Sequence, residues 1–327
     1  MGSVLITGAN GMLGRRLTAQ VLEAGTLAGP DGKQTVVDAV VAADVAEPPV
    51  KLSDARLTYR VGDISDPDFV SDIVDSEVTS VFHLAGVVSG AAERDFDLGQ
   101  RVNVDGMTYL LEILRSLGTA PRFVFTSSLA VYGGDLPARL TDGQRLTPQT
   151  SYGMQKAMGE FLVAEYTRRG WIDGRALRLP TIAIRPGAAN AAASSFVSAI
   201  VREPLAGRAY ACPVDETVRS PILSPGRCVE NLLRAHELPA DAWGWDRSVT
   251  LPSLDATVAD LVDAVRRIGG EQAAELVTYE PDPFVAAIVA GWPQAFDTSR
   301  ALRLGFTADA SVDEIVAAHV EDVRAGW

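Results

Sequence analysis

Apolar residues in the first 180 positions recur with two alternating periods, and these periods predict the order of strands and helices. Short buried-type runs, each typical of a strand, occupy residues 4–7, 36–43, 57–61, 80–84, 122–126 and 175–179. The segments between them repeat apolar residues at helical spacing, most clearly at 13–22 and 96–117. Strands separated by helices pair in parallel, so we expect an α/β fold with a doubly wound parallel sheet.

The regular alternation ends after the sixth strand, which predicts a second lobe. Residues 182–214 are rich in Ala, Ser, Pro and Gly, as is typical of irregular structure. Residues 215–238 indicate a return to the sheet domain, with a helix near 229–235. We therefore expect a sheet domain of residues 1–181 with 215–238, and a smaller lobe of 182–214 and 239–327.

Two later helices carry start signals. Thr257 precedes Asp260 by three residues, and Ser311 precedes Glu314 by three. In both cases apolar residues follow at helical spacing, which is the pattern of an N-terminal capping box.

A turn with three glycines follows the first strand. Thr7-Gly8-Ala9-Asn10-Gly11-Met12-Leu13-Gly14 joins that strand to a helix. Gly8 allows the tight turn, Gly11 lets a pyrophosphate approach the backbone, and Gly14 lets helix and strand pack closely. Unpaired N–H groups of the helix would then face the phosphates. This context predicts a dinucleotide site.

An acidic residue ends the second strand. Asp44 directly follows the run 36–43. A carboxylate here accepts hydrogen bonds from an adenosine ribose and repels a 2′-phosphate, which favours NAD over NADP. Asp44 comes later than the usual ~20 residues after the glycines, and the loop at 28–32 accounts for the delay. The alternative is that Asp44 only starts a turn.

Polar or small residues also follow the later strands, where parallel sheets bind ligands. Asp63 either meets an adenine amino group or caps the helix that starts near Asp66. Ala85-Gly86 leaves room for a cofactor backbone, and Ser127-Ser128 points into the crevice at the sheet edge.

Tyr152 and Lys156 are four residues apart in a predicted helix, so their side chains share one face. A free phenol titrates near ~10, and an ammonium within roughly 4–6 Å lowers that pKa by about 1–3 units. The pair is suited to moving the proton of an alcohol while hydride moves at its carbon. The same spacing also arises by chance on solvated helices. On this helix we expect the inward side chains to be Met154, Met158, Phe161 and Leu162.

The composition excludes several classes of protein. The 327 residues carry a formal net charge of −13, which argues against a nucleic-acid or anionic-membrane surface. Two cysteines make no disulfide framework, and three scattered histidines lack zinc-ligand spacing, so we expect no metal site. No apolar run reaches the ~18–20 residues of a membrane span, and we recognise no signal peptide. A cytoplasmic protein is therefore expected.

Taken in order, these motifs resemble those of the extended short-chain dehydrogenases/reductases, the group that also contains the sugar-nucleotide epimerases. The resemblance rests on TGANGMLG at 7–14, Asp44, GDI at 62–64, HLAG at 83–86, Asn103, TSS at 126–128, YGMQK at 152–156, LPT at 179–181 and RALRLGF at 300–306. It implies a Rossmann-type sheet domain, NAD as cofactor and a homodimer formed by the helices at 97–117 and 151–169.

The resemblance also implies roles for individual residues. Tyr152 would be the general acid/base, Lys156 its electrostatic partner and a ribose ligand, and Ser128 would hydrogen-bond the reacting oxygen. The cofactor would be held by Gly8, Asn10, Gly11, Met12, Leu13, Gly14, Asp44, Asp63, Ile64, Leu84, Ala85, Gly86, Asn103, Tyr152, Lys156, Pro180 and Ile182.

The remaining segments address the reaction. Family dehydratases carry Asp-Glu where Ser127-Ser128 stands, so dehydration is disfavoured. Residues 184–187, 190–196 and 219–225 are similar to the D-erythronate dehydrogenase branch. A sugar acid carries a carboxylate that an Arg fork binds bidentately. Candidate substrate ligands are Ser89, Ser127, Ser128, Tyr152, Thr181, Arg185, Asn190, Ser194, Ser195 and Arg219. Each arginine could equally form a surface or inter-lobe ion pair, and Ser194-Ser195 could be a tight turn.

Three functions remain open at this point. The first is NAD-dependent oxidation of the 2-hydroxyl of a short aldonate to the 2-oxo acid. The second is 4-epimerisation of a nucleotide sugar, which needs a larger pocket and a retained cofactor. The third is a nucleotide sensor without catalysis, which the intact Ser128, Tyr152 and Lys156 disfavour.

Overall fold

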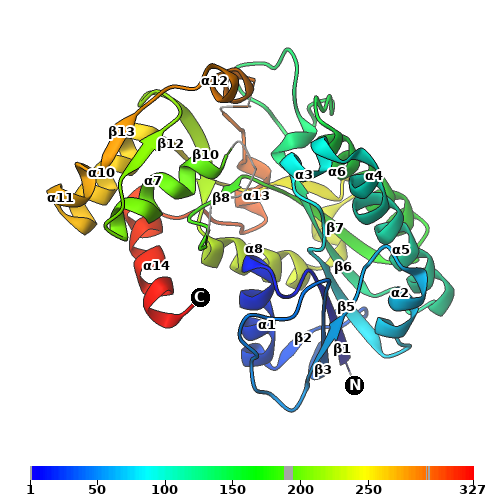
Figure 1. Cartoon of the computed structure of the whole chain (residues 1–327). Helices are drawn as coiled ribbons and strands as arrows, with labels where there is room; N and C mark the ends of the chain where they lie inside the picture. Colours follow the sequence, from blue (N-terminus) through cyan, green and yellow to red (C-terminus); the bar gives the residue numbers. More distant parts are fainter. Residues whose placement is uncertain (1, 188–193, 292, 294) are drawn as a thin grey trace. The chain divides into compact units, whose positions relative to one another are not determined.

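The computed structural model describes residues 2–187, 194–291, 293 and 295–327, which form two compact units (Figure 1). The first, here the sheet unit, comprises Met1–Val131, Pro148–Arg178 and Val229–Val249. The second unit comprises Tyr132–Thr147, Leu179–Cys228 and Thr250–Trp327. The return to the sheet unit thus begins at Val229, not at residue 215, and the segment Tyr132–Thr147 groups with the second unit.

The sheet is the predicted doubly wound type. Its strands are β1 (Gly2–Thr7), β2 (Thr26–Ala28), β3 (Gln34–Asp44), β4 (Leu57–Val61), β5 (Val78–His83), β6 (Arg122–Ser128), β7 (Asp173–Leu179) and β11 (Ser248–Thr250). Their order is β11-β7-β6-β5-β1-β3-β2, with β4 also paired to β3. The pairs β1–β3, β1–β5, β3–β4 and β5–β6 are parallel. The prediction missed β2, which forms an antiparallel hairpin with β3 around the predicted loop at 28–32.

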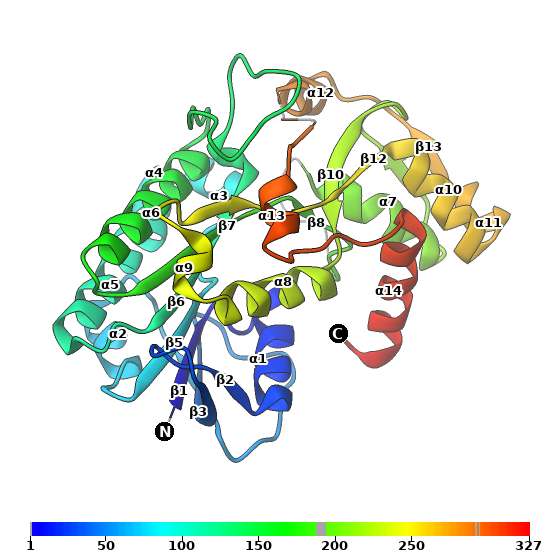
Figure 2. The ribbon, with the colours of Figure 1, turned by 180° about the vertical axis from the view of Figure 1, so that it is seen from behind.

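The helices of the sheet unit are α1 (Met12–Ala24), α2 (Pro67–Ile73), α3 (Ser89–Arg94), α4 (Phe96–Gly99), α5 (Gly106–Leu117), α6 (Ser151–Arg168), α9 (Ala240–Trp243) and the later part of α8 (Pro225–Glu237). Figures 1 and 2 show α2, α5 and α6 over one face of the sheet and α1 over the other. A short 3-10 turn, Leu129–Val131, follows β6.

Two helix predictions need correction. The segment 96–117 is interrupted by a π-helical stretch, Gln100–Asp105, which contains Asn103. On α6 the predicted inward stripe is wrong for Met158 and Phe161, which are 38% and 66% exposed, whereas Leu162 is partly buried against the core and Met154 is half-buried. The buried face is instead formed by Gly153, Gln155, Lys156, Ala157, Gly159, Glu160, Val163 and Tyr166. Polar side chains on this face have partners on neighbouring elements: Gln155 bonds to Asn103, Lys156 to the Thr126 carbonyl and Glu160 to Arg178.

Arginines bind the end of α8 at the amino edge of the sheet. Arg122 donates to the carbonyls of His236 and Leu238, and Arg175 donates to the Leu238 carbonyl at 2.9 Å. The last carbonyls of a helix have no partner within it, so these donors satisfy them. The His236 ring also bonds Ser80 Oγ, at 2.8 Å. The return segment is thereby fixed to the sheet.

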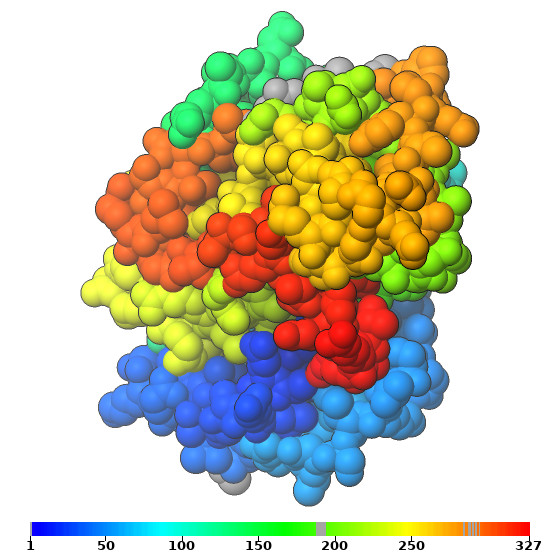
Figure 3. Space-filling view, turned by 90° about the vertical axis from the view of Figure 1, so that its left-hand side faces the viewer, coloured from blue at the N-terminus to red at the C-terminus, as the bar shows by residue number. Residues whose placement is uncertain are grey.

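The second unit contains two small sheets. Strands β12 (Leu254–Thr257), β10 (Arg219–Leu223) and β8 (Thr181–Ile182) form one, and β13 (Val277–Tyr279) pairs with β9 (Tyr210–Cys212) in the other. Its helices are α7 (Ser195–Leu205), α10 (Val258–Gly269), α11 (Glu271–Ala274), α12 (Pro283–Ala290), α13 (Ser299–Arg303) and α14 (Val312–Ala325). Figure 3 shows α10, α11 and α14 side by side on one face.

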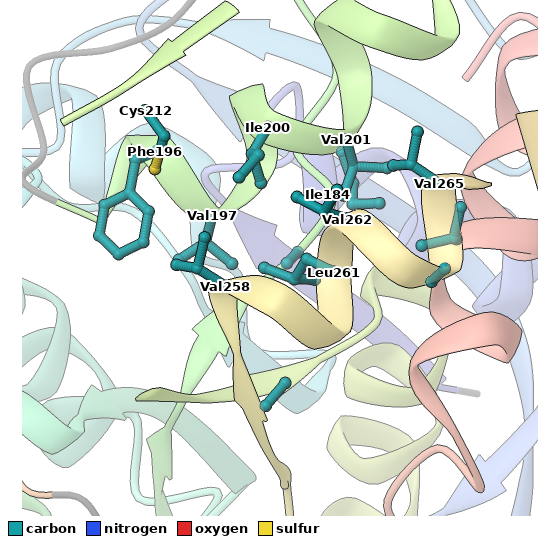
Figure 4. Packing of buried hydrophobic residues seen from close by; sticks show 14 of the residues in the cluster. Ile184, Phe196, Val197, Ile200, Val201, Cys212, Val258, Leu261, Val262 and Val265 are labelled. Carbon is teal, nitrogen blue, oxygen red and sulfur yellow. The ribbon is translucent and has the colours of Figure 1, made fainter. Parts of the chain in front are cut away.

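The core of this unit lies between α7 and α10. Figure 4 shows Phe196, Val197, Ile200 and Val201 packed near Val258, Leu261, Val262 and Val265. The expectation of irregular structure over 182–214 is therefore wrong for α7 and β9. That expectation followed the Ala/Ser-rich composition and gave too little weight to the helical spacing of the apolar residues at 196–201. Both capped helices are confirmed: Thr257 and Asp260 form the full capping box of α10, and Ser311 accepts from the Glu314 N–H at the start of α14. None of the described helices is long and apolar enough to cross a membrane.

Candidate active site

The loops after β1, β3, β5 and β6 all leave the carboxyl edge of the sheet, on either side of β1. The strand order reverses there, since β1 pairs with both β3 and β5. In open α/β sheets this position is where ligands bind. The sheet unit thus brings the predicted catalytic and most predicted cofactor residues to one edge.

The three glycines of the first turn differ in how strictly the surrounding structure requires glycine. Gly8 has φ +68°, and a Cβ there would lie 2.7 Å from the Ala85 nitrogen. A Cβ on Gly14 would lie 2.2 Å from the Gly8 oxygen, so only glycine permits this packing of α1. A Cβ on Gly11 would meet only the Gly8 oxygen, at 3.3 Å. The fold therefore constrains Gly11 much less than Gly8 or Gly14, and its open side suits the approach of a ligand.

Asp44 holds the glycine turn. One carboxylate oxygen accepts the Asn10 N–H at 2.9 Å, and the other accepts the Ala46 N–H at 3.1 Å. Asn10 also donates from Nδ2 to the Ala46 carbonyl at 2.6 Å. Asp44 thus does start a turn, as the alternative interpretation held. Each oxygen keeps a second lone pair for a ribose hydroxyl, so the two roles are compatible.

Asp63 follows β4 and is exposed, whereas Ile64 is 7% exposed. Asp63 Oδ1 accepts from both the N–H and the hydroxyl of Ser65, at 2.8 Å each. The cap of α2 is supplied by Asp66, which accepts from the Asp68 N–H. Asp63 is therefore not the helix cap, which removes one of the two interpretations of this residue.

Leu84, Ala85 and Gly86 follow β5. The Leu84 N–H donates to the Thr7 carbonyl at 3.1 Å, and the Ala85 N–H to Thr7 Oγ1 at 3.3 Å. A Cβ on Gly86 would lie 3.0 Å from Asn103 Oδ1 and 3.5 Å from Lys156 Nζ. Gly86 thus lies beside the lysine predicted to act in catalysis.

Asn103 is 4% exposed. Its amide accepts the Val87 N–H at 2.7 Å and donates to the Val87 carbonyl at 3.1 Å and to Gln155 Oε1 at 2.7 Å. These bonds tie the loop after β5 to α6. The contacts give Asn103 an organising role, and its predicted contact with the cofactor stays a prediction.

The two serines at the end of β6 have different surroundings. Ser128 is half-buried, and its Oγ accepts the Ala130 N–H at 3.1 Å, so its hydroxyl hydrogen can be donated to a substrate oxygen. Ser127 is buried and donates to Glu160 Oε1 at 2.6 Å. That bond argues against the substrate role predicted for Ser127.

Tyr152 and Lys156 lie on α6, whose N-cap is Thr150. Lys156 Nζ is 5.7 Å from the centroid of the Tyr152 ring and 4.7 Å from that of Phe125. It donates to the Thr126 carbonyl at 2.8 Å. Burial lowers the pKa of Lys156 to about 8. The ammonium is therefore held next to the phenol with one fixed acceptor and donors to spare for a ribose.

His83 is a packed strand residue beside this lysine. Burial, and secondarily the charge of Lys156, lowers its pKa to about 3. Its Nδ1 lies 2.8 Å from Thr7 Oγ1, which already accepts the Ala85 N–H. This bond, whose donor depends on the tautomer of the neutral ring, links β1 to β5.

The residues present fit a dinucleotide. The N-terminus of α1 is capped by Gly11 without any side-chain hydrogen bond, so its first N–H groups suit phosphate oxygens. Asn10 Oδ1 is buried and has no hydrogen-bond partner among the described residues. Asp44 supplies the ribose acceptor at the end of β3.

The other predicted ligands belong to the second unit, except Ser89, the first residue of α3 in the sheet unit. Pro180, which separates β7 from β8 in the sequence, is buried. Thr181 and Ile182 pair with Ile222 and Leu223 of β10. Ser194 and Ser195 start α7, and Asn190 lies outside the described residues.

The two predicted arginines of this unit differ in their contacts. The Arg185 backbone N–H donates to Ser198 Oγ at 3.0 Å, and its carbonyl accepts from Arg202 at 2.9 Å, so its backbone is fixed. Arg219 is 47% exposed and donates from Nε to Asp255 at 2.8 Å. Arg219 thus forms the surface ion pair left open as the alternative.

Sequence reasoning missed Glu160 and Arg178, which form a buried ion pair beside Ser127. The available signal was the spacing of four between Lys156 and Glu160. The apolar stripe wrongly expected on α6 concealed it.

Comparisons with known proteins agree with this geometry. Residues 4–238 match the family model described as "NAD dependent epimerase/dehydratase family". The chain is 49% identical over 320 residues to a D-erythronate dehydrogenase of Cupriavidus necator, covering 98% of each chain. It is 38% identical to that of Haemophilus influenzae, covering 97% of this chain and 98% of the relative. The structure of a nucleoside-diphosphate-sugar epimerase from Agrobacterium tumefaciens has a TM-score of 0.92 and 40% identity, covering 100% of this chain and 96% of the other.

Proposed function

The chain belongs to the NAD dependent epimerase/dehydratase family, and we propose that it oxidises the 2-hydroxyl of a short aldonate such as D-erythronate to the 2-oxo acid. It is an NAD-dependent dehydrogenase of the extended short-chain type. The observation that carries the substrate class is the similarity to two D-erythronate dehydrogenases over nearly the whole of both chains.

The site residues support a simple proton path. Bound NAD⁺ supplies a hydride acceptor. Tyr152 takes the proton of the substrate hydroxyl as the C2 hydrogen leaves with its electron pair, and a C=O bond replaces the C–O single bond. Ser128 donates a hydrogen bond to the same oxygen. Lys156 stabilises the phenolate electrostatically, and its burial strengthens this effect by excluding water.

Arg185 is our candidate for the substrate carboxylate. A guanidinium binds a carboxylate through two parallel hydrogen bonds, and the fixed backbone of Arg185 limits where that fork can lie. Arg219 is the second candidate, and its Nε would have to leave Asp255 to bind a substrate. Ser89, Thr181, Asn190, Ser194 and Ser195 remain predicted ligands for the other hydroxyls.

Nucleotide-sugar 4-epimerisation is the second candidate, favoured by the similarity to the Agrobacterium tumefaciens structure. An epimerase returns the hydride to its substrate and retains its cofactor, whereas a dehydrogenase releases NADH. A purified protein with tightly held NAD would support epimerisation. A non-catalytic sensor is disfavoured by the presence of Ser128, Tyr152 and Lys156 around one sheet edge.

The test is NADH formation at 340 nm with C3–C6 aldonates, run beside an epimerisation assay with nucleotide sugars. We expect turnover with a four-carbon acid. Epimerisation without NADH formation from any aldonate would overturn the proposal.

We also propose a homodimer formed through α4, α5 and α6. Four apolar residues of these helices are unusually exposed: Phe96 by 51%, Leu117 by 37%, Met158 by 38% and Phe161 by 66%. Exposed apolar patches on helices favour association. Sedimentation should give a dimer for the wild type and a monomer for Phe161→Glu, and a wild-type monomer at micromolar concentration would contradict this.

We propose a cytoplasmic location for the protein. Cys212 and Cys228 are buried free thiols, which suits a reducing compartment. Fractionation of the native host that recovered the protein outside the cytoplasm would contradict this location.

A further inference from the structure

Helix α6 carries a buried carboxylate in line with Tyr152 and Lys156. Glu160 follows Lys156 by four positions, so the three side chains lie along one face of the helix. Glu160 is 3% exposed, and its partner Arg178 on β7 is 4% exposed. The proton path described above does not use either charge.

The contacts of Glu160 leave it little freedom. Arg178 binds it as a fork, with Nε 2.9 Å from Oε1 and Nη2 2.7 Å from Oε2. Ser127 Oγ donates to Oε1 at 2.6 Å. The carboxylate is therefore held by donors from β6 and β7 at once, and such a bidentate arrangement constrains direction as well as distance.

Neighbouring contacts define how α6 lies on β6. The Thr126 carbonyl accepts from Lys156 Nζ, and a Cβ on Gly159 would lie 2.6 Å from the Phe125 ring. Three consecutive residues of β6, at 125–127, thus contact α6, and Ser128 comes next in the same strand. A shift of the helix along β6 would break the Glu160 fork and change the separation of Tyr152 from Ser128.

Stability alone does not explain this pair. Removing two charges from water costs free energy that their attraction often fails to return, and apolar replacements of similar volume are frequently neutral or stabilising. A geometric role accounts for the pair better, because an apolar contact can slide whereas a forked ion pair cannot.

We propose that Glu160 and Arg178 are positioning residues that fix α6 on β6 and β7 and thereby set the geometry of Tyr152 relative to Ser128. The kinetic consequence rests on the proposed dehydrogenase function. The geometric claim concerns the protein without any ligand.

Two variants test the pair. Glu160→Gln keeps one amide oxygen, which can accept from Ser127 and Arg178 Nε, but removes the charge and the acceptor of Arg178 Nη2. The double variant Glu160→Leu/Arg178→Met removes both charges and keeps the volume, so it avoids a lone buried charge. Controls are Glu165→Gln, in an exposed ion pair with Arg168 on the same helix, and Ile73→Ala, which removes core volume on α2.

Three quantities are measured. The first is the steady-state rate, normalised to the concentration of NADH-binding sites. The second is the deuterium isotope effect, measured with the acid deuterated at C2. The third is the titration midpoint of the Tyr152 phenol, taken at 295 nm as the difference between the wild type and Tyr152→Phe. In the double variant we expect kcat to fall at least tenfold, KM for NAD⁺ to stay within threefold, the isotope effect on kcat to rise and the phenol midpoint to move. Glu160→Gln should show a smaller loss in the same direction.

The proposal would be overturned if the double variant kept the wild-type kcat per binding site and the wild-type phenol midpoint. It would also be overturned if Ile73→Ala lost as much kcat as the double variant. If the double variant does not fold, Glu160→Gln and Ser127→Ala decide in the same way: wild-type kcat and phenol midpoint in both would overturn the proposal. If the wild type turns over no aldonate, the proposed function fails, whereas the phenol titration still tests the positioning role.

Discussion

Lys156 donates a 2.8 Å hydrogen bond to the backbone carbonyl of Thr126, the residue two positions before Ser128 on β6. The bond joins the catalytic helix to the catalytic strand through a charged group that is 5% exposed. Burial of this ammonium lowers the free energy of unfolding, and we attribute the retention of the charge to its function. The cost leads to a prediction about stability and one about pH.

Lys156→Met should abolish turnover and stabilise the fold at pH 7. Burial lowers the pKa of Lys156 from 10.5 to about 8, which corresponds to about 3 kcal/mol against the charged form. The variant loses that cost and also loses the bond to Thr126, worth about 1 kcal/mol. We expect urea unfolding to show a gain of about 1–2 kcal/mol at pH 7.

The pH dependence gives the sign of this effect. Because the folded pKa lies below the unfolded one, the unfolded chain binds more protons between pH 8 and pH 10.5. The unfolding free energy of the wild type therefore rises across this window relative to that of Lys156→Met, and the difference between them shrinks. A difference that stays constant from pH 7 to pH 10 would show that folding does not lower the pKa of Lys156, because both states would then bind the same number of protons.

Tyr152→Phe should separate chemistry from binding. The substitution keeps the ring near Lys156 but removes the proton acceptor, so we expect kcat to fall by about 10²–10⁴. NADH affinity, measured by fluorescence titration, should change by no more than about tenfold, because a lost neutral hydrogen bond is worth about 0.5–1.5 kcal/mol. Unchanged turnover would remove Tyr152 from the mechanism.

Asp44→Ala should weaken NAD binding and reduce its preference over NADP. The carboxylate accepts from Asn10 and Ala46, and a hydrogen bond to a charged group contributes about 1.5–3 kcal/mol. We therefore expect KM for NAD⁺ to rise by about 10–100-fold. Asp38→Asn is the matched control on the same strand, since the Asp38 carboxylate accepts the N–H of Gly2, which lies at the end of β1 opposite to the glycine turn. Equal effects of both variants would indicate a loss of β3 rather than of a ribose ligand.

Acid should destabilise the sheet unit through His236. Burial lowers the pKa of His236 below 6.5, so the folded state keeps it neutral while the unfolded chain protonates it as pH falls below 6.5. As the pH falls below 6.5, this residue therefore lowers the unfolding free energy by about 1.4 kcal/mol per pH unit until the pKa of the folded state is reached. His236→Gln, which can still bond Ser80, should lessen the slope of unfolding free energy between pH 6.5 and pH 5. An unchanged slope would contradict a neutral buried ring.

The parts of the structure that followed from the sequence are those in which one local pattern decides the outcome. Gly8, Gly14 and the Thr257 capping box each satisfy a short-range steric or hydrogen-bond requirement, and the structure confirms all three. The face of α6 did not follow, because Glu160 is buried only by virtue of Arg178, which is 18 positions later. The interpretation of Arg219 stayed open for the same reason, since its partner Asp255 comes from another strand.

Gly11→Ala and Gly14→Ala should have opposite consequences. A Cβ on Gly14 would lie 2.2 Å from the Gly8 oxygen and 2.6 Å from Ala9 Cα, so α1 must move away from β1. A Cβ on Gly11 meets only one atom, at 3.3 Å, but occupies the side from which a pyrophosphate would approach. Thermal unfolding should show a marked loss for Gly14→Ala and little change for Gly11→Ala.

NADH titration should then show weakened binding in Gly11→Ala despite its intact fold. The methyl group displaces phosphate oxygens from the N–H groups of α1, which carries no side-chain cap to replace them. Gly226→Ala, on a glycine whose Cβ would meet no atom within 4 Å, serves as the control for helix substitution. Normal NADH affinity in Gly11→Ala would mean that the phosphates bind elsewhere, and the dinucleotide site would have to be moved from the start of α1.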